Sequence, residues 1–349
     1  MSILSLRHWG AAWATAVAMA CVAADAPSRP NFLILLIDDM CWGDPGCYGG
    51  RLVPTPHIDR LAAEGVRFTQ GYSTGCICSP SRVGLLAGRY QARIGHDINT
   101  QEGGPKGVER SQRALDPAEV TLAQRLKAAG YGTGIIGKWH PGSHDASQLP
   151  GARGFDVAWG STANLRHRAR WYDGTNTFPC PTHRLITTPD YAVRAMEFIR
   201  HPPATPWFLY VSFNAVHGPW AASSNWLDRV QHLSPSPREQ NYAAMMLELD
   251  DAMGRILDTL RELNLDRSTL VICTDDNGDA APMIGHMGGL PGRKWTLYEG
   301  GIRVPWIVRW AGRFPAGRVL DTPVIQLDIA ATLLAAAGST CGQSGSWTE

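Results

Sequence analysis

Residues 78 to 89 combine a cysteine, a proline and an arginine in a pattern that is suited to chemistry. They run Cys-Ser-Pro-Ser-Arg-Val-Gly-Leu-Leu-Ala-Gly-Arg, which predicts a helix beginning at Cys78. Pro80 suits a first helical turn, where its missing N–H is not needed and its φ is already helical. The positive helix end then faces Cys78, and Arg82 adds a cation one turn on. The segment predicts a reactive cysteine beside an anion site; the alternative is an ordinary helix start with a structural or disulfide-bonded cysteine.

A pair of carboxylates follows what we expect to be a buried strand. Residues 31–37 are Asn-Phe-Leu-Ile-Leu-Leu-Ile, an apolar run typical of a strand covered on both faces of a parallel sheet. Asp38 and Asp39 come next, and ligands collect at the carboxyl ends of such strands. Carboxylate oxygens suit Ca²⁺ or Mg²⁺. The pair predicts a cation site, with a solvated turn or a helix cap as the alternative.

Lysine and histidine side chains follow two further predicted strands. In the Gly-Lys-Trp-His segment at residues 137–140, Lys138 and His140 alternate with the tryptophan and so share one face of the strand end. A second apolar run, residues 207–213, leads to His217, and histidine is the natural proton donor near neutral pH. The alternatives are a surface lysine beside a core Trp-His pair and a hydrogen-bonded structural histidine.

The remaining patterns place these residues on an α/β fold with a mostly parallel central sheet flanked by helices. We expect a short strand before the Cys78 segment and strands at residues 31–37, 131–136, 207–213, 270–273 and 306–310. We expect helices at residues 56–64, 120–129, 189–199, 241–263 and 327–337. Residues 161–180 are rich in Arg, His and Trp, and we expect an irregular loop there that is either functional or merely solvated.

The overall composition is that of a folded protein without a large net charge. The 349 residues suffice for one large α/β domain or two smaller ones. Apolar residues make up 44% and charged residues 18%, which excludes a disordered chain. Lys plus Arg total 32 against 31 Asp plus Glu, so we expect no nucleic-acid partner, because binding to a phosphate backbone needs a basic surface.

Residues 1–26 have the pattern of a secretory signal peptide. Basic residues precede a largely apolar run at residues 9–20, and Ala-Asp-Ala at residues 24–26 offers a small-x-small cleavage site. The run is too short for a membrane span, and no other segment is a candidate. We therefore expect an exported, periplasmic or secreted protein with no stable membrane partner. Lipoprotein anchoring at Cys21 and a buried N-terminal helix are the alternatives.

Export would place the eight cysteines in a compartment where disulfides persist. Setting aside Cys21 and Cys78 leaves an even number, which permits full pairing in fifteen ways, and the sequence does not choose among them. The remaining cysteines are Cys41, Cys47, Cys76, Cys180, Cys273 and Cys341.

The Cys-x-Pro-Ser-Arg core at residues 78–82, followed by Leu-x-Ala-Gly-Arg, resembles the signature of the type I sulfatases. Four other blocks resemble that family in the expected order along roughly residues 30 to 338. They are the Asp-Asp pair at 38–39, Gly-Lys-Trp-His at 137–140, Asp-Asn-Gly at 276–278 and the block at 294–305. The resemblance implies an alkaline-phosphatase-like α/β fold, with a catalytic domain over residues 27–338.

The resemblance also implies a modified nucleophile. In type I sulfatases a formylglycine-generating enzyme oxidises the signature cysteine to Cα-formylglycine, and the matching position here is Cys78. The aldehyde hydrate would attack sulfur and displace the alcohol, and its second hydroxyl would then expel sulfate and restore the aldehyde. The implied function is hydrolysis of a small-molecule or saccharide sulfate ester.

A bound divalent cation is implied as well, with Ca²⁺ expected and Mg²⁺ as the alternative. By resemblance its ligands are Asp38, Asp39, Asp276 and Asn277, together with the formylglycine at Cys78. The cation would polarise the sulfate as a Lewis acid. For Asp276 and Asn277 the alternative is an Asx-rich turn, which is common after strands.

Five further positions match catalytic side chains of the family. Arg82 and Lys138 would stabilise the nucleophile and its charge, and His140 would orient it or take its proton. Lys294 and His217 would serve the sulfate and the departing oxygen.

The end of the chain departs from the family pattern. Type I sulfatases continue into a smaller C-terminal subdomain built around an antiparallel sheet, whereas residues 339–349 provide a short tail, so we expect that subdomain to be missing. Two rival functions follow. A phosphodiester or phosphonate ester hydrolase could use the same site, because phosphate and sulfate esters are similar tetrahedral anions. A truncated chain could instead be non-catalytic and bind sulfated ligands or nothing.

Overall fold

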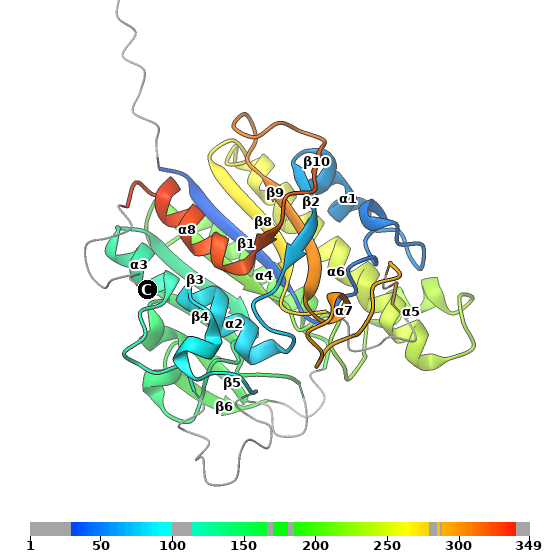
Figure 1. Cartoon of the computed structure of the whole chain (residues 1–349), viewed down its shortest axis with the longest axis horizontal. Coiled ribbons are helices and arrows are strands. Elements are labelled where there is room, and N and C mark those ends of the chain that lie inside the picture. The colour runs from blue at the N-terminus through cyan, green and yellow to red at the C-terminus, as the bar shows by residue number, and fades with distance from the viewer. Residues whose placement is uncertain are drawn as a thin grey trace, which may run out of the picture.

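The computed structural model describes residues 29–99, 114–165, 170–180, 185–278, 285–286 and 288–339. The expected signal peptide at residues 1–26 and nearly all of the expected tail at residues 339–349 lie outside this part of the chain. The described residues form one sheet with the strand order β10-β2-β9-β8-β1-β7-β3-β4-β5-β6, and β11 also pairs with β2 (Figure 1).

The strands are β1 (Asn31–Ile37), β2 (Val66–Tyr72), β3 (Gly132–Gly137), β4 (Val157–Ser161), β5 (Arg170–Asp173), β6 (Asn176–Pro179), β7 (Trp207–Ser212), β8 (Thr269–Asp275), β9 (Arg303–Arg309), β10 (Arg318–Leu320) and β11 (Val324–Ile325). The helices are α1 (Pro56–Ala63), α2 (Cys78–Ala87), α3 (Leu122–Ala128), α4 (Thr188–Arg200), α5 (Ser224–Val230), α6 (Pro237–Glu262), α7 (Glu299–Ile302) and α8 (Gln326–Ala336).

The centre of the sheet is parallel, as the unbroken apolar runs predicted. β8, β1, β7, β3 and β4 pair in parallel, with Leu35 of β1 opposite Val211 of β7 and Cys273 of β8. The antiparallel pairs lie toward the two ends, where β9 joins β8 to β2 and where β5 joins β4 to β6. The predicted α/β fold with a helix-flanked sheet is therefore confirmed.

β1 explains why a central strand needs an unbroken apolar sequence. Successive side chains of a strand point to opposite faces of the sheet. Leu33 and Leu35 accordingly pack in one core with α1, α4 and α6, whereas Phe32 and Ile34 pack in a second core with α2, α3 and α8. Full burial of such a side chain contributes roughly 1.5–3 kcal/mol. Figure 1 shows α2, α3 and α8 on the near face of the sheet and α4 and α6 behind it.

One expectation for the described residues needs correction. Residues 161–180 are not an irregular loop throughout, because β5 and β6 form a hairpin on the edge of β4 in which Trp171 and Tyr172 are buried. Strands this short leave too few residues for an alternating pattern to stand out. The six described cysteines, which include Cys78, form no disulfide with one another, and Cys341 lies outside the described residues.

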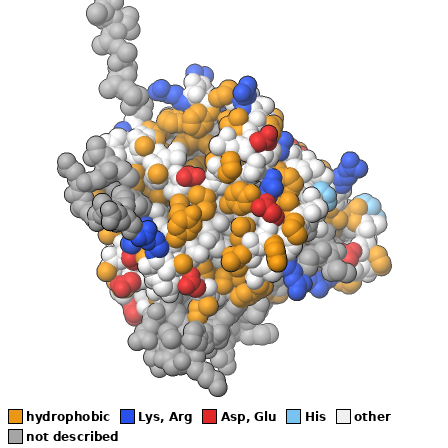
Figure 2. Space-filling model, in the orientation of Figure 1, with side chains coloured by type: hydrophobic (Ala, Val, Ile, Leu, Met, Phe, Trp, Pro, Cys, Tyr) orange, Lys and Arg blue, Asp and Glu red, His pale blue; other side chains and the backbone are white. Residues whose placement is uncertain are grey.

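The surface is mixed in charge, in keeping with the near balance of basic and acidic residues. Figure 2 shows basic and acidic side chains interspersed with apolar ones on the face in view. Among the helices that the structure describes, none is both long and apolar enough to cross a membrane.

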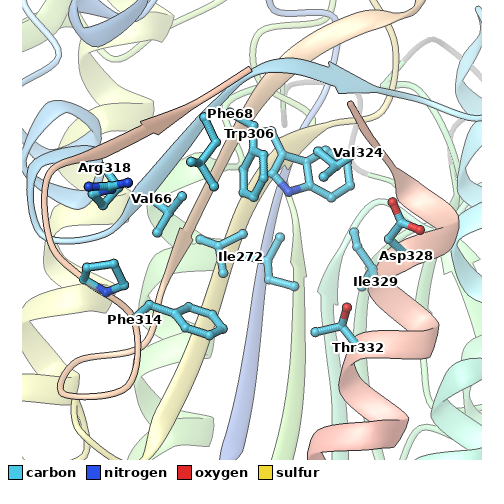
Figure 3. A pocket seen from close by; sticks show the side chains of 13 residues that line it. Val66, Phe68, Ile272, Trp306, Phe314, Arg318, Val324, Asp328, Ile329 and Thr332 are labelled. Atoms are coloured by element: carbon cyan, nitrogen blue, oxygen red, sulfur yellow. The ribbon is translucent and has the colours of Figure 1, made fainter. Parts of the chain in front are cut away.

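An apolar cavity of about 420 Å³ lies between α8 and the strands β2, β8 and β9 (Figure 3). Its walls include Phe68, Ile272 and Trp306 from the strands and Ile329 from the helix. None of the predicted catalytic or metal-binding residues lines it. The cavity is therefore not part of the candidate site.

Candidate active site

The predicted reactive residues converge at the carboxyl edge of the parallel strands. Polar side chains follow each of the four central strands, and α2 begins at the same edge with Cys78 as its first residue. Ligands collect at this edge in open α/β sheets because the strand ends and the helix starts meet there. The residues that follow the strands are Asp38 and Asp39 after β1, Lys138 and His140 after β3, His217 after β7, and Asp276 and Asn277 after β8.

A glycine lets the end of β3 approach its neighbour closely. Gly137 has φ +120°, and a Cβ atom at this position would lie 1.9 Å from the carbonyl oxygen of Ser212. The same carbonyl accepts the backbone N–H of Lys138 at 2.7 Å. Glycine is therefore required so that Lys138 leaves the strand toward the reactive centre.

Cys78 lies at the centre of the cluster and is fully buried. Its Sγ lies 3.6 Å from Asp38 Oδ1 and 3.0 Å from Lys294 Nζ. Burial raises the pKa of the Cys78 thiol, and the positive charges of Lys138 and Lys294 do not offset that effect. The unmodified side chain is consequently a protonated thiol at neutral pH and not an activated thiolate.

Two buried cations neutralise the carboxylates beneath Cys78. Arg82 Nε donates to Asp276 Oδ2 at 2.8 Å, and its Nη2 lies at the ion-pair distance of 2.8 Å from the same oxygen. Lys138 Nζ lies 2.6 Å from Asp38 Oδ2. All four side chains have no exposed surface. Burial by itself raises the pKa of Asp38, but the attraction of Lys138 and Arg82 holds it well below its usual range. Asp38 is therefore ionised, and the pairing offsets the cost of burying these charges.

Asp39 links the second lysine and the histidine to the same centre. Its Oδ1 lies 2.6 Å from Lys294 Nζ and accepts a 2.7 Å hydrogen bond from Asn277 Nδ2. Its Oδ2 lies 3.3 Å from His217 Nε2. Burial lowers the pKa of His217 in spite of the neighbouring Asp39 and Asp38, so this imidazole is neutral at neutral pH.

The oxygen atoms that face the centre fit a hard divalent cation. Asp39 Oδ2, Asp276 Oδ1 and Asn277 Oδ1 are buried and, in the described part of the chain, have no hydrogen-bond donor. Ligand atoms of Asp38, Asp39, Cys78 and His217 lie within 4.8 Å of one another. Burial, together with the charge of Asp38, raises the pKa of Asp276 to about 6. Buried oxygens without donors are costly, and a cation would satisfy them.

His140 is buried beside the same cluster. Its backbone is held by a 2.9 Å bond from its N–H to Thr162 O, and its φ is +81°. Burial, followed by the positive charges of Lys138 and Arg82, lowers its pKa well below the usual histidine value. His140 is therefore a neutral imidazole, able to accept or to donate a proton.

Sequence reasoning missed several residues that position the site. Asp275 accepts the backbone N–H of Asp39 at 3.2 Å and of Met40 at 2.8 Å, and Ser212 Oγ accepts from Arg82. Asp275 directly precedes the predicted ligand Asp276, but nothing in the sequence indicates that it accepts from the backbone after β1. The partner of Arg82 could not be found from sequence, because Ser212 lies 130 residues away on another strand.

A third missed residue, His96, supports the start of α2. Ser79 Oγ donates to His140 O at 3.0 Å and lies 2.7 Å from His96 Nε2, while Ser79 N–H donates to Asn99 Oδ1 at 3.0 Å. Since the carbonyl can only accept, His96 Nε2 must be the donor to Ser79. The histidine therefore holds together the two segments that carry Cys78 and His140.

We expect His96→Gln to flatten the acid dependence of stability. Burial lowers the pKa of His96 from 6.5 to about 4, so between these pH values the unfolded chain binds the extra proton. The wild type then loses free energy of unfolding, on the order of 3 kcal/mol, as pH falls through this window. Glutamine can still donate to Ser79 but does not titrate. Urea unfolding at pH 7 and pH 4 measures the difference.

The exposed His201 offers a control for that experiment. His201→Gln should follow the wild-type pH curve. If His96→Gln lost as much stability on acidification as the wild type does, the assignment of the buried neutral imidazole would be wrong.

The fold and the site together define the class of protein. The helix-flanked α/β sheet with its parallel centre matches the fold of sulfatase and alkaline-phosphatase-like structures. The family model described as Sulfatase matches residues 30–339. The chain belongs to the sulfatase family, as the resemblance predicted.

Relatives that are named as sulfatases agree with this assignment. N-acetylgalactosamine-6-sulfatase of Canis lupus familiaris is 36% identical over 343 residues, which cover 90% of this chain and 64% of that protein. Steryl-sulfatase of Rattus norvegicus is 32% identical, with 91% of this chain and 68% of that protein covered. The chain therefore spans only 64% of the length of the first of these relatives.

Solved structures show the same fold. The crystal structure of Ps i-CgsB in complex with k-i-k-neocarrahexaose matches with a TM-score of 0.80 at 25% identity, over 90% of this chain and 73% of that chain. PsFucS1 sulfatase from Pseudoalteromonas sp. gives a TM-score of 0.74 at 28% identity, over 89% and 68%. Phosphonate monoester hydrolase of Agrobacterium radiobacter, with a TM-score of 0.63 at 20% identity over 89% and 74%, shares the fold alone.

Proposed function

We propose that this chain carries the catalytic centre of a sulfuric ester hydrolase that cleaves sulfate monoesters. The observation that carries the proposal is the cluster around Cys78. Lys294 Nζ lies 3.0 Å from its Sγ. Asp38, which pairs with Lys138 and Arg82, lies 3.6 Å from the same atom. Fixed cations around a nucleophile position favour an anionic ester and the charge that develops on it. Membership of the sulfatase family supports the same reaction.

Position 78 fits a modified nucleophile better than a thiolate. The burial that raises the thiol pKa leaves the unmodified cysteine protonated and unreactive at neutral pH. We propose that a formylglycine-generating enzyme converts Cys78 to formylglycine, whose hydrate supplies the attacking oxygen. The residues around it then hold that group in place, and Lys294 supplies a positive charge where the anionic ester arrives.

A divalent cation, Ca²⁺ with Mg²⁺ as the alternative, completes the proposed site. Asp38, Asp39, Asp276 and Asn277 would hold it, which agrees with the buried oxygens that have no donor among the described residues. When bound, the cation supplies Lewis-acid polarisation of the ester. The ion pairs to Arg82 and Lys138 keep the carboxylates ionised and oriented toward it.

The two buried histidines have different places in the proposed reaction. His217 lies at the more open side, with its side chain 10% exposed, and its Nε2 is 3.3 Å from Asp39. We assign it to the departing alcohol oxygen. His140, which is nearly fully buried beside Lys138, is assigned to orienting the nucleophile or accepting its proton.

We propose a saccharide or other small-molecule sulfate ester as the substrate. One relative is named for the 6-sulfate of N-acetylgalactosamine and another for steryl sulfate, so these two family members differ in the alcohol for which they are named. We also propose that residues 27–338 form the catalytic domain of an exported protein whose first 26 residues are removed, a step that an N-terminal mass measurement would detect.

The choice between sulfate and phosphate esters is tested by a pair of substrates. For the matured protein, we expect kcat/KM for an aryl sulfate to exceed that for the matching aryl phosphodiester by roughly tenfold or more. The reverse order would favour a phosphodiester or phosphonate ester hydrolase. Turnover of neither ester, with position 78 shown to be modified, would favour a non-catalytic chain.

Cation binding should stabilise the protein independently of turnover. Calcium at 100 times its Kd should raise the free energy of unfolding by about 2.7 kcal/mol, because it binds only the folded site. Asn277→Ala removes a proposed ligand and should abolish most of this gain. Asp251→Asn, in the adjacent aspartate pair at residues 250–251 of α6, should retain it. Thermal unfolding with and without calcium measures the effect; an equal gain in all three proteins would rule out this site.

A further inference from the structure

The segment that carries Lys294 forms a tight turn over the reactive centre. Thr296 N–H donates to Arg293 O at 3.0 Å, which closes a four-residue turn around Lys294 and Trp295. Trp295 has φ +75° at the third position, as in a type II turn. Lys294 occupies the second position, and its Nζ reaches Cys78 and Asp39.

Tryptophan is an unfavourable residue at this position. The third residue of a type II turn is usually glycine, because a side chain at positive φ meets the following carbonyl oxygen. Nor does core packing explain the choice, since 57% of Trp295 is exposed. A strained backbone that presents a large exposed indole beside a reactive lysine points to a role in the site and not in the fold.

The indole is held at a fixed place relative to position 78. The backbone N–H of Trp295 donates to Cys76 O at 3.0 Å, two residues before the nucleophile position. Its neighbour Lys294 is nearly fully buried against Cys78 Sγ. The turn therefore directs the Lys294 side chain inward to position 78 and leaves the next side chain, Trp295, largely in solvent.

Two more exposed apolar side chains follow on the same segment. Leu297 is 78% exposed and Tyr298 is 67% exposed. Three exposed apolar side chains within four residues are uncommon on the surface of a soluble protein and mark a binding site. Ligand pockets combine such apolar and aromatic walls with a few well-placed charges, here Lys294.

We propose that Trp295, with Leu297 and Tyr298, forms the subsite for the leaving group and binds a ring-bearing alcohol by stacking of the ring face on the indole. This inference rests on the proposed sulfatase function and names the class of ester that the site prefers. A pyranose with its axial C–H groups and an aryl ring share the flat apolar face that an indole recognises. A short alkyl sulfate lacks such a face.

The test is Trp295→Gly in the matured enzyme. Glycine suits the positive φ, so this variant keeps the turn and removes only the indole. We measure kcat/KM for an aryl sulfate, a monosaccharide sulfate and a short alkyl sulfate. For one or both ring-bearing substrates, we expect kcat/KM relative to that of the alkyl sulfate to fall roughly tenfold. The fall should come mainly from a higher KM for the ring-bearing substrate. Trp295→Phe should recover part of the loss.

A matched control separates the indole from relief of backbone strain. Asn264, at the end of α6, is another non-glycine residue with positive φ, at 56°. Asn264→Gly should leave the substrate ratios unchanged. A fall confined to the aryl or to the saccharide sulfate would support the subsite and identify its ligand.

The negative outcomes are distinguishable. If Trp295→Gly hydrolysed all three sulfates with the wild-type ratios, the subsite would be wrong while the sulfatase function stood. If the matured wild type hydrolysed none of them, the proposed function would fail and the subsite with it.

Discussion

We expect Cys78→Ala to lose sulfate ester turnover by at least about 10⁴-fold while keeping its fold. The side chain lies in the centre of the cluster, 3.0 Å from Lys294 Nζ and 3.6 Å from Asp38 Oδ1, so nothing else occupies the place of the attacking group. Alanine removes one sulfur atom and leaves the backbone of α2 intact. Steady-state kinetics measures the loss, and circular dichroism with thermal unfolding verifies the fold.

Cys47→Ser is the matched control for that variant. The Cys47 thiol hydrogen-bonds to Asp59 on the opposite side of the sheet from α2, and a serine hydroxyl can make the same bond. We expect turnover within a few fold of wild type. Retention of activity by a folded Cys78→Ala protein would contradict the assignment of the nucleophile.

Arg82→Ala should produce the largest loss of stability among substitutions at the site. The guanidinium is fully buried, contacts Asp276 at 2.8 Å and lies 3.7 Å from Asp38. Removing it leaves a buried carboxylate without its partner, which costs about 3–5 kcal/mol. The free energy of unfolding in urea, measured on the unmatured protein, reports this cost apart from catalysis.

The chain contains an exposed ion pair with the same distance, which serves for comparison. Arg60 contacts Asp258 at the same 2.8 Å, but their side chains are 37% and 43% exposed. Exposed pairs are screened by water, so Arg60→Ala should cost less than about 1 kcal/mol. Similar losses for Arg60→Ala and Arg82→Ala would show that burial does not set the strength of the inner pair.

The parallel core could be predicted because burial on both faces leaves a plain mark in the sequence. The run at residues 31–37 has no polar residue after Asn31, and β1 has the predicted bounds. β7 and β8 were found in the same way, with ends that differ by a few residues where hydrogen bonding fades into turns. Their polar C-terminal neighbours then indicated the site.

Pairing within the site could not be predicted, because it depends on distances between strand ends that are far apart in sequence. Arg82 and Lys138 were both expected near the nucleophile. In the structure Arg82 pairs with Asp276, and Lys138 pairs with Asp38. These pairings follow only from the order in which β8, β1, β7 and β3 lie side by side. His96 escaped notice because it lies in a connection with no periodic pattern.

We propose a sulfatase centre built on a modified residue 78, and the mass of the peptide that contains Cys78 is the first measurement to make. The full chain should be produced together with a formylglycine-generating enzyme, alongside a known sulfatase as a control for conversion. We predict the aldehyde mass at position 78. An unmodified cysteine in this chain, with the control sulfatase converted in the same cells, would contradict the claim.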